Sequence, residues 1–178
     1  MNLIVVFLQK AIAQGIAILY GANGEIVTEK SGNLNLGVPG MMYMGGVAGL
    51  MGAFLYENSV ESPVPFVGML IALVCALVCS GLGALIYSVL TISLRANQNV
   101  TGLALSIFGT GAGQFIGEYM RVTSGGYVSI SNSLKAVFMN SPMPAFLQNI
   151  PILGPLLFQY NIFVYLGVVV AVVMSLYL

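Results

Sequence analysis

The chain has 178 residues, of which 58% are hydrophobic and 6% charged, with five basic and five acidic side chains and no net charge. Soluble domains carry about 25% charged residues, so this composition excludes a fully solvated surface and predicts an all-α integral membrane protein in contact with the lipid bilayer. The neutral balance also argues against nucleic acid as a partner.

The residue types that most enzymes and metal sites need are scarce. The sequence has no His and no Asp, which excludes Ser–His and Cys–His pairs. Cys75 and Cys79 are four residues apart in an apolar run, a spacing that indicates helix packing rather than a zinc or redox motif. A membrane enzyme would have to rely on Glu118 beside an apolar segment. We therefore expect no catalytic residue, no bound metal and no enzymatic activity.

Five apolar segments predict about five transmembrane or partly re-entrant helices, since a bilayer is crossed by about 20 apolar residues. Residues 3–21, 66–91 and 159–178 are long enough to span it. Residues 39–55 and 100–117 are shorter, and could be tilted, re-entrant or discontinuous.

Small residues recur at intervals of four within these segments. Such residues allow helix backbones to approach closely, and in lipid this packing takes the place of the hydrophobic effect. The longest such series lies in 66–91, and because its stripe winds around the helix we expect this helix to be central. The predicted packing positions are Gly45, Gly49, Ala53, Ala72, Ala76, Ser80, Gly109, Gly113 and Gly117.

A polar, glycine-rich passage, residues 24–46, separates the first two apolar segments. It reads G-E-I-V-T-E-K-S-G-N-L-N-L-G-V-P-G-M-M-Y-M-G-G. Because unpaired backbone groups are costly in lipid, we expect it at a membrane surface or lining a cavity inside the protein.

Uncharged polar side chains beside or inside apolar segments are the candidates for a solute path. Amides and hydroxyls can hydrogen-bond a neutral polar solute without the cost of a buried charge. Phe108 and Phe115 could stack on a ring of that solute. The alternative is that the amides cap helix ends and pair with backbone groups. The candidates are Asn33, Asn35, Gln98, Asn99, Thr101 and Gln114.

Basic residues in short loops favour the cytoplasm, which places Lys30 and Arg95 inside and residues 56–65 outside. Residues 118–158 then form an extracytoplasmic loop region of a single transmembrane domain, 1–178. This region could be a binding surface for an external partner or a lid over the bundle.

Two motifs resemble bacterial ABC importer permeases for nucleosides and simple sugars, within the branched-chain amino acid and ribose-type superfamily. The passage 24–46 is similar to that family's early signature, although Pro39 stands where the family has Glu. L-R-A-N-Q-N-V-T-G-L-A-L-S, residues 94–106, resembles its second motif, with Ser106 in place of Asn.

The resemblance implies a multi-pass permease of the bacterial plasma membrane that works with a second permease subunit, an ATP-binding subunit and an extracytoplasmic solute-binding protein. ATP would be used by the partner, and this chain has no P-loop to bind it. Such permeases are about twice as long, so the chain resembles an N-terminal half. The alternative function is a truncated, non-transporting membrane assembly subunit.

Overall fold

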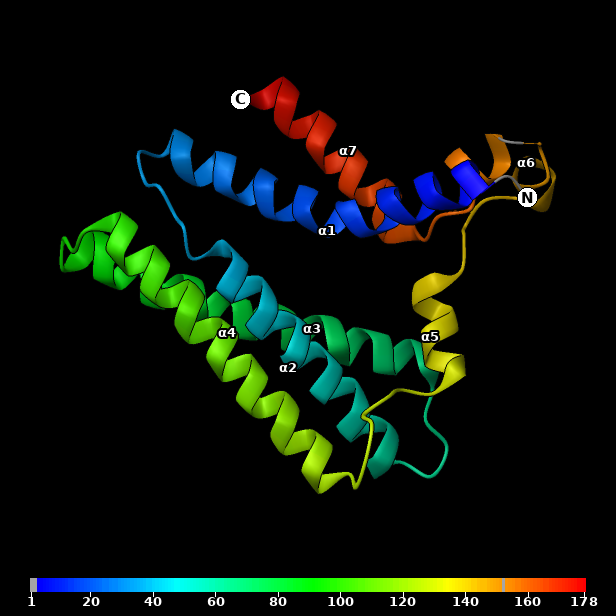
Figure 1. Ribbon diagram of the computed structural model, residues 1–178, viewed down its shortest axis with the longest axis horizontal. Helices are drawn as coiled ribbons and strands as arrows, with labels where there is room; N and C mark the ends of the chain where they lie inside the picture. Colours follow the sequence, from blue (N-terminus) through cyan, green and yellow to red (C-terminus); the bar gives the residue numbers. More distant parts are fainter. Residues whose placement is uncertain (1–2, 152) are drawn as a thin grey trace. The chain divides into compact units, whose positions relative to one another are not determined.

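The computed structural model describes residues 3–151 and 153–178, which form helices and connections with no strand among them (Figure 1). Four of the helices are long and apolar enough to cross a membrane, and a fifth apolar helix is shorter. The prediction of an all-α membrane protein is confirmed. The chain divides into two compact units, one comprising Glu25–Lys135 and the other the two ends of the chain, up to Gly24 and from Ala136.

The unit Glu25–Lys135 contains three long helices, α2 (Val38–Ser59), α3 (Pro65–Ser88) and α4 (Gln98–Thr123). One π-helical turn, η1 (Val89–Ser93), continues α3. The segments that we expected to be short are therefore full-length, with 22 residues in α2 and 26 in α4. At 1.5 Å per residue, each of these two helices is longer than the hydrocarbon core of about 30 Å.

The first helix, α1 (Leu3–Lys30), continues well beyond the predicted end at residue 21, so the first part of the polar passage is helical. It ends in a Schellman motif, in which Gly32 N donates to Glu29 O at 2.9 Å and Asn33 N to Thr28 O at 3.1 Å. Gly32 has φ +87°, a conformation that glycine adopts without a steric penalty. Only the short stretch 31–37 remains as a loop before α2.

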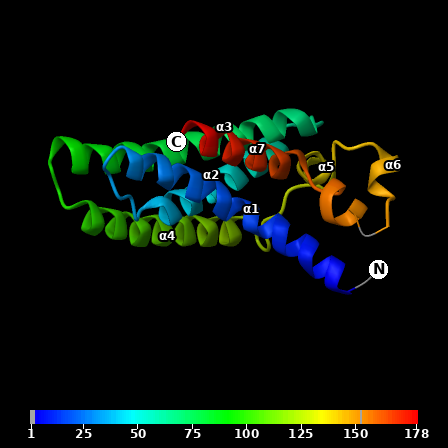
Figure 2. The same ribbon diagram turned by 90° about the horizontal axis from the view of Figure 1, so that it is seen from above.

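Helix α2 lies between α3 and α4, which scarcely touch each other (Figure 2). Its contact with α3 uses small residues on both sides: a methyl group added at Gly49 would lie 3.0 Å from Ala72 O and 3.3 Å from Ala76 Cβ. Gly45 is buried against Ser80. Within this unit α2, and not the helix of residues 66–91, is central, because the small residues from Ala72 to Ser80 face α2.

The contact between α2 and α4 is closer still. A methyl group added at Gly109 would lie 2.6 Å from the carbonyl oxygen of Gly40, so the two backbones meet directly. One turn further along α4, a methyl group at Gly113 would lie 2.5 Å from the ring of Tyr43. A methyl group added at Gly117 would meet no other helix within 4 Å among the described residues, and the packing role of Gly117 stays a prediction.

The other unit contains most of α1, with α6 (Ala145–Gln148), the π-helical turn η2 (Gly154–Phe158) and α7 (Ile162–Tyr177). Here α7 packs on α1: a methyl group at Gly167 would lie 2.9 Å from Ile16 and 3.0 Å from Tyr20. The Tyr20 hydroxyl donates to Phe163 O at 2.8 Å.

The predicted loop region 118–158 is largely helical, since α4 runs into it as far as Thr123 and α5 (Asn132–Met139) follows. The connection between them is fastened to the end of α2. The Glu57 carboxylate accepts hydrogen bonds from Ser131 N, at 2.8 Å, and from the Ser131 hydroxyl.

Candidate functional site

The loop 31–37 is held against α4 by one amide side chain, that of Gln98. Its Oε1 accepts from Leu34 N at 2.9 Å, and its Nε2 donates to Asn33 Oδ1 at 3.0 Å and to Gly32 O at 3.4 Å. Gln98 is the first residue of α4, whose N-cap is Asn97; the Asn97 side chain accepts from Val100 N at 3.1 Å. The capped helix end therefore positions Gln98 on the loop, and the two sequence motifs meet there.

Asn35 and Glu25 shape the second half of the loop. Glu25 Oε1 accepts from Asn35 N at 2.7 Å, while the buried Oε2 has no partner among the described residues. Asn35 is buried, and its Oδ1 accepts from Gly37 N at 2.9 Å, an Asx turn that leads directly into α2.

Two further side chains pair with backbone carbonyls of the loop. The Tyr87 hydroxyl, from α3, donates to Leu34 O at 2.7 Å, and the Ser106 hydroxyl, from α4, donates to Leu36 O at 2.6 Å. The Tyr87 side chain is 4% exposed and lies in a buried cluster with Met41 and Leu105.

We call this set of side chains the loop network. Its members come from α1, the loop itself, α3 and α4, and they satisfy loop backbone groups that would otherwise be unpaired. The loop network consists of Glu25, Asn33, Asn35, Tyr87, Gln98 and Ser106. It brings the connection that follows Lys30 and the one that contains Arg95 to the same end of this unit. The assignment of that end to the cytoplasm stays a prediction.

The structure therefore brings three of the six candidate path residues together, namely Asn33, Asn35 and Gln98. Thr101 is buried one turn further along α4, whereas Asn99 and Gln114 are exposed on that helix. A path role stays a prediction for all six.

Gln114 lies in an open groove of about 450 Å³ on the surface of α4, which we call the α4 groove. The residues that line it are Ser106, Ile107, Thr110, Gly111 and Gln114. The Thr110 hydroxyl donates to Ser106 O at 2.8 Å, one turn back along the helix. Phe108 and Phe115, which we expected to stack on a solute ring, are not among the lining residues.

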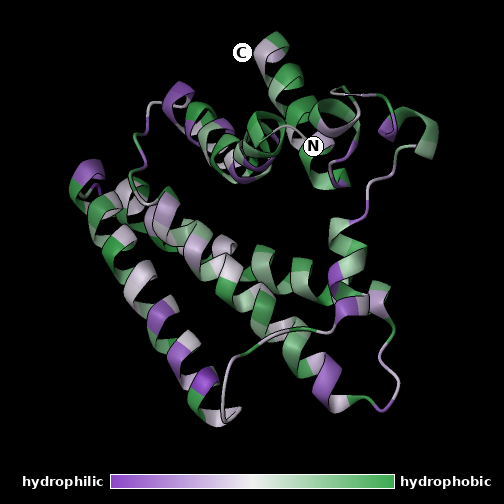
Figure 3. Cartoon of the chain, turned by 45° about the vertical axis from the view of Figure 1, so that its right-hand side comes forward, coloured by the Kyte–Doolittle hydropathy of each residue, from purple (hydrophilic) through white to green (hydrophobic). Residues whose placement is uncertain are grey.

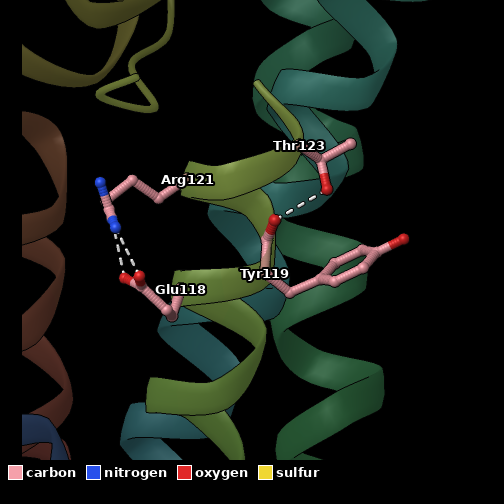
Figure 4. A network of polar contacts seen from close by, with 4 residues as sticks. All are labelled: Glu118, Tyr119, Arg121 and Thr123. Carbon is pink, nitrogen blue, oxygen red and sulfur yellow. Dashed lines mark hydrogen bonds and ion pairs between the residues drawn. The ribbon is translucent and has the colours of Figure 1, made fainter. Parts of the chain in front are cut away.

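Polar residues continue along the same helix beyond the groove, and hydrophilic bands recur on α4 in Figure 3. Near its end, Arg121 Nε donates to Glu118 Oε2 at 2.8 Å and Arg121 Nη2 to Glu118 Oε1 at 2.5 Å. This pair projects from one side of α4, while the ring of Tyr119 projects from another (Figure 4). Glu118, the one carboxylate considered for an enzymatic role, is thus paired with Arg121.

Four contributors were missed by sequence reasoning, namely Glu25, Tyr87, Ser106 and Thr110. Ser106 lies in the second motif and could have been noticed there, but Tyr87 is one of nine tyrosines without a distinguishing signal. Among residues 3–151 and 153–178, no group of three or more His, Cys, Asp or Glu could hold a metal ion.

Comparison with known proteins gives a family match over nearly the whole chain. The model of the family described as "Branched-chain amino acid transport system / permease component" matches residues 7–178. No solved structure matches the chain.

Three relatives carry the name of an ABC transporter permease. The chain is 26% identical to the guanosine ABC transporter permease protein NupQ of Bacillus subtilis over 80% of this chain and 41% of NupQ. It is 24% identical to the nucleoside ABC transporter permease protein NupC of Lactococcus lactis over 96% of this chain and 51% of NupC.

The third relative is TsgC13 of Haloferax volcanii, whose assignment as a glucose ABC transporter permease protein is itself provisional. It is 30% identical over 62% of this chain and 31% of its own length. The chain thus matches about half or less of the length of each of these relatives.

Proposed function

The chain belongs to the permease family of branched-chain amino acid transport systems, and from this premise we propose that it lines the membrane path of an ABC importer. The observation that carries the proposal is the family match over residues 7–178, which include α2, α3 and α4 in full. These helices have the length and hydropathy of membrane spans, and one of them has an open groove whose lining includes two hydroxyls and one amide.

The solute of this importer is neutral and polar, a nucleoside or a simple sugar. The names of the relatives point to guanosine, to nucleosides and to glucose. The α4 groove supports a neutral solute, because its polar groups are hydroxyls and an amide and none of its lining residues is charged.

Energy for transport comes from a separate ATP-binding subunit in the bacterial plasma membrane, and this chain binds no cofactor and carries out no chemistry. A second permease subunit completes the path, and an extracytoplasmic solute-binding protein delivers the solute. ATP binding and hydrolysis drive alternating access. The solute path is lined by Gln114 and Asn99, with Thr101 behind them. The hinge at the loop is formed by Asn33, Asn35 and Gln98.

The test is uptake of radiolabelled nucleosides and sugars by cells that lack their own transporters. The chain is expressed together with the ATP-binding and permease subunits of its own transporter. The experiment is done with and without the C-terminal half of a full-length relative. Uptake that depends on the chain is the expected result. A chain that assembles with its partners but supports no uptake in either form would instead identify the non-transporting assembly subunit.

A further inference from the structure

The surface of α4 has three faces with different chemistry. One face packs on α2 through Gly109 and Gly113. A second is apolar and exposed, with Phe108 60% and Phe115 74% exposed. The third face carries polar side chains that fall within about 120° of arc at 100° per residue, and the exposed Val100, Leu103 and Ile107 lie in the same arc. The polar face consists of Asn99, Ser106, Thr110, Gln114, Glu118 and Arg121.

The polar face extends from Asn99 to Arg121, which is about 33 Å at 1.5 Å per residue and slightly more than the hydrocarbon core of about 30 Å. Polar and ionised side chains at membrane depth are costly in lipid, and they face protein or a water-filled space. The exposed rings of Phe108 and Phe115 give α4 a separate face suited to lipid. The polar face therefore borders water or another protein surface.

The hydrogen bonds within the α4 groove favour a particular ligand chemistry. The hydroxyl hydrogens of Ser106 and Thr110 are used by Leu36 O and Ser106 O, so each hydroxyl presents acceptor lone pairs to the groove. The Gln114 amide, which has no hydrogen bond among the described residues, offers both donors and an acceptor. A ligand rich in aliphatic hydroxyls, each a donor and an acceptor, complements this set.

The lining of the groove also indicates which part of a solute it contacts. Successive polar side chains at i, i+4 and i+8 are about 6 Å apart along the axis, which is close to the width of a sugar ring. Among the described residues no aromatic ring lines the groove, so a nucleobase would find no stacking partner in this lining.

We propose that the α4 groove is a subsite for the hydroxyl-bearing sugar part of the solute, within a water-filled path along the polar face of α4. The proposal rests on the permease function proposed above, which it deepens by naming the part of the solute that is recognised. It predicts that a sugar and a nucleoside occupy the same groove, and that a free nucleobase does not.

The test is cysteine accessibility in membrane vesicles that contain the assembled transporter. In a Cys75→Ala, Cys79→Ala background, single cysteines replace Ser106, Thr110 and Gln114, with Phe108→Cys and Phe115→Cys as controls on the apolar face. A charged methanethiosulfonate reagent modifies thiolates, which form in water and not in lipid. We expect modification at the groove positions to be at least tenfold faster than at the control positions.

Protection then tests the ligand chemistry. We expect ribose, glucose and uridine to slow modification of Thr110→Cys and Gln114→Cys at least threefold, and free uracil to have no effect. These two variants decide the outcome if Ser106→Cys, which loses its bond to Leu36 O, fails to assemble.

Two results would overturn the proposal. The first is modification that is equal or absent at the groove and control positions, together with disulfide cross-linking of Gln114→Cys between two copies. This result would make the polar face an interface between subunits. Rapid modification without sugar protection, or with equal protection by uracil, would rule out the sugar subsite. Labelling requires no turnover, so the two proposals can fail separately. If the solutes protect the cysteines from labelling but no uptake occurs, the importer function is ruled out and the subsite is retained.

Discussion

In the loop network, amide and hydroxyl groups are paired with backbone atoms, whereas in the α4 groove the Gln114 amide has no partner among the described residues. Both regions use amide and hydroxyl side chains beside apolar helices, and the loop network adds the carboxylate of Glu25. Gln98 makes three hydrogen bonds to the loop. The comparison shows that residue type alone does not separate the two regions, because hydroxyls paired with backbone carbonyls occur in both, and the unpaired Gln114 amide distinguishes the groove.

Ser106 connects the two regions. Its hydroxyl hydrogen is bonded to Leu36 O in the loop network, and the same side chain lines the α4 groove. A movement of the loop would therefore change the position of a groove residue directly. This connection would give the proposed hinge at the loop a physical route to the proposed solute subsite.

The largest loss of stability is expected at the backbone contact between α2 and α4, on which both regions depend. Gly109→Leu would place side-chain atoms against the Gly40 carbonyl, which lies 2.6 Å from an added methyl group and cannot move without displacing α2. We expect a loss of about 3 kcal/mol or more of stability, or failure to assemble.

The effect of Gly109→Leu is measured as the thermal midpoint of unfolding and the yield of monodisperse protein. Gly111→Leu, on the same helix with nothing within 4 Å, is the matched control and should retain assembly. Equal losses in the two variants would contradict the proposed importance of the α2–α4 contact.

The second prediction removes the central residue of the loop network. Gln98→Ala leaves Leu34 N and Asn33 Oδ1 without their partner, and we expect a loss of about 2 kcal/mol. The neighbouring substitution Asn99→Ala, at an exposed position, should change stability by less than about 0.5 kcal/mol. Denaturant titration of both variants measures the difference, and identical curves would show that the network contributes nothing.

The third prediction concerns one hydroxyl. Tyr87→Phe keeps the buried ring but leaves Leu34 O without its donor, and we expect a loss of about 1 kcal/mol. Tyr119→Phe is the control, since that ring is exposed on the surface of α4. The two are compared by thermal denaturation, and a Tyr119→Phe loss as large as that of Tyr87→Phe would contradict the assignment.

The smallest effect on stability is expected in the α4 groove. Thr110→Val keeps the shape of the side chain but removes its hydroxyl, and we expect an unchanged thermal midpoint. The KM for uptake should rise threefold to tenfold, which corresponds to a lost hydrogen bond of about 0.6–1.4 kcal/mol.

Thr123→Val is the matched control for this substitution. Thr123 makes the same bond to the carbonyl one turn back, to Tyr119 O at 2.8 Å, but lies outside the groove. Its KM should stay at the wild-type value. A similar rise in both variants would trace the effect to the helix backbone rather than to solute binding.

The class of the fold, the approximate helices and the family motifs could be predicted from composition and local pattern. Long apolar runs in a chain with few charges can satisfy their backbone groups in lipid only as helices, so this conclusion required no knowledge of packing. The small residues at Gly49, Ala72 and Gly109 also predicted close helix contacts, because their spacing is a local property of one helix.

Only the tertiary structure decided which of these faces meet and which polar groups are paired. The bond between Gln98 and Asn33 joins residues 65 positions apart, and it depends on how α4 lies beside the loop. The central position of α2 and the continuation of α1 to Lys30 likewise depend on neighbouring helices and on the Schellman end at Gly32. Local periodicity specifies the face of a helix but not its neighbour, because the direction of each helix is set by contacts distant in sequence.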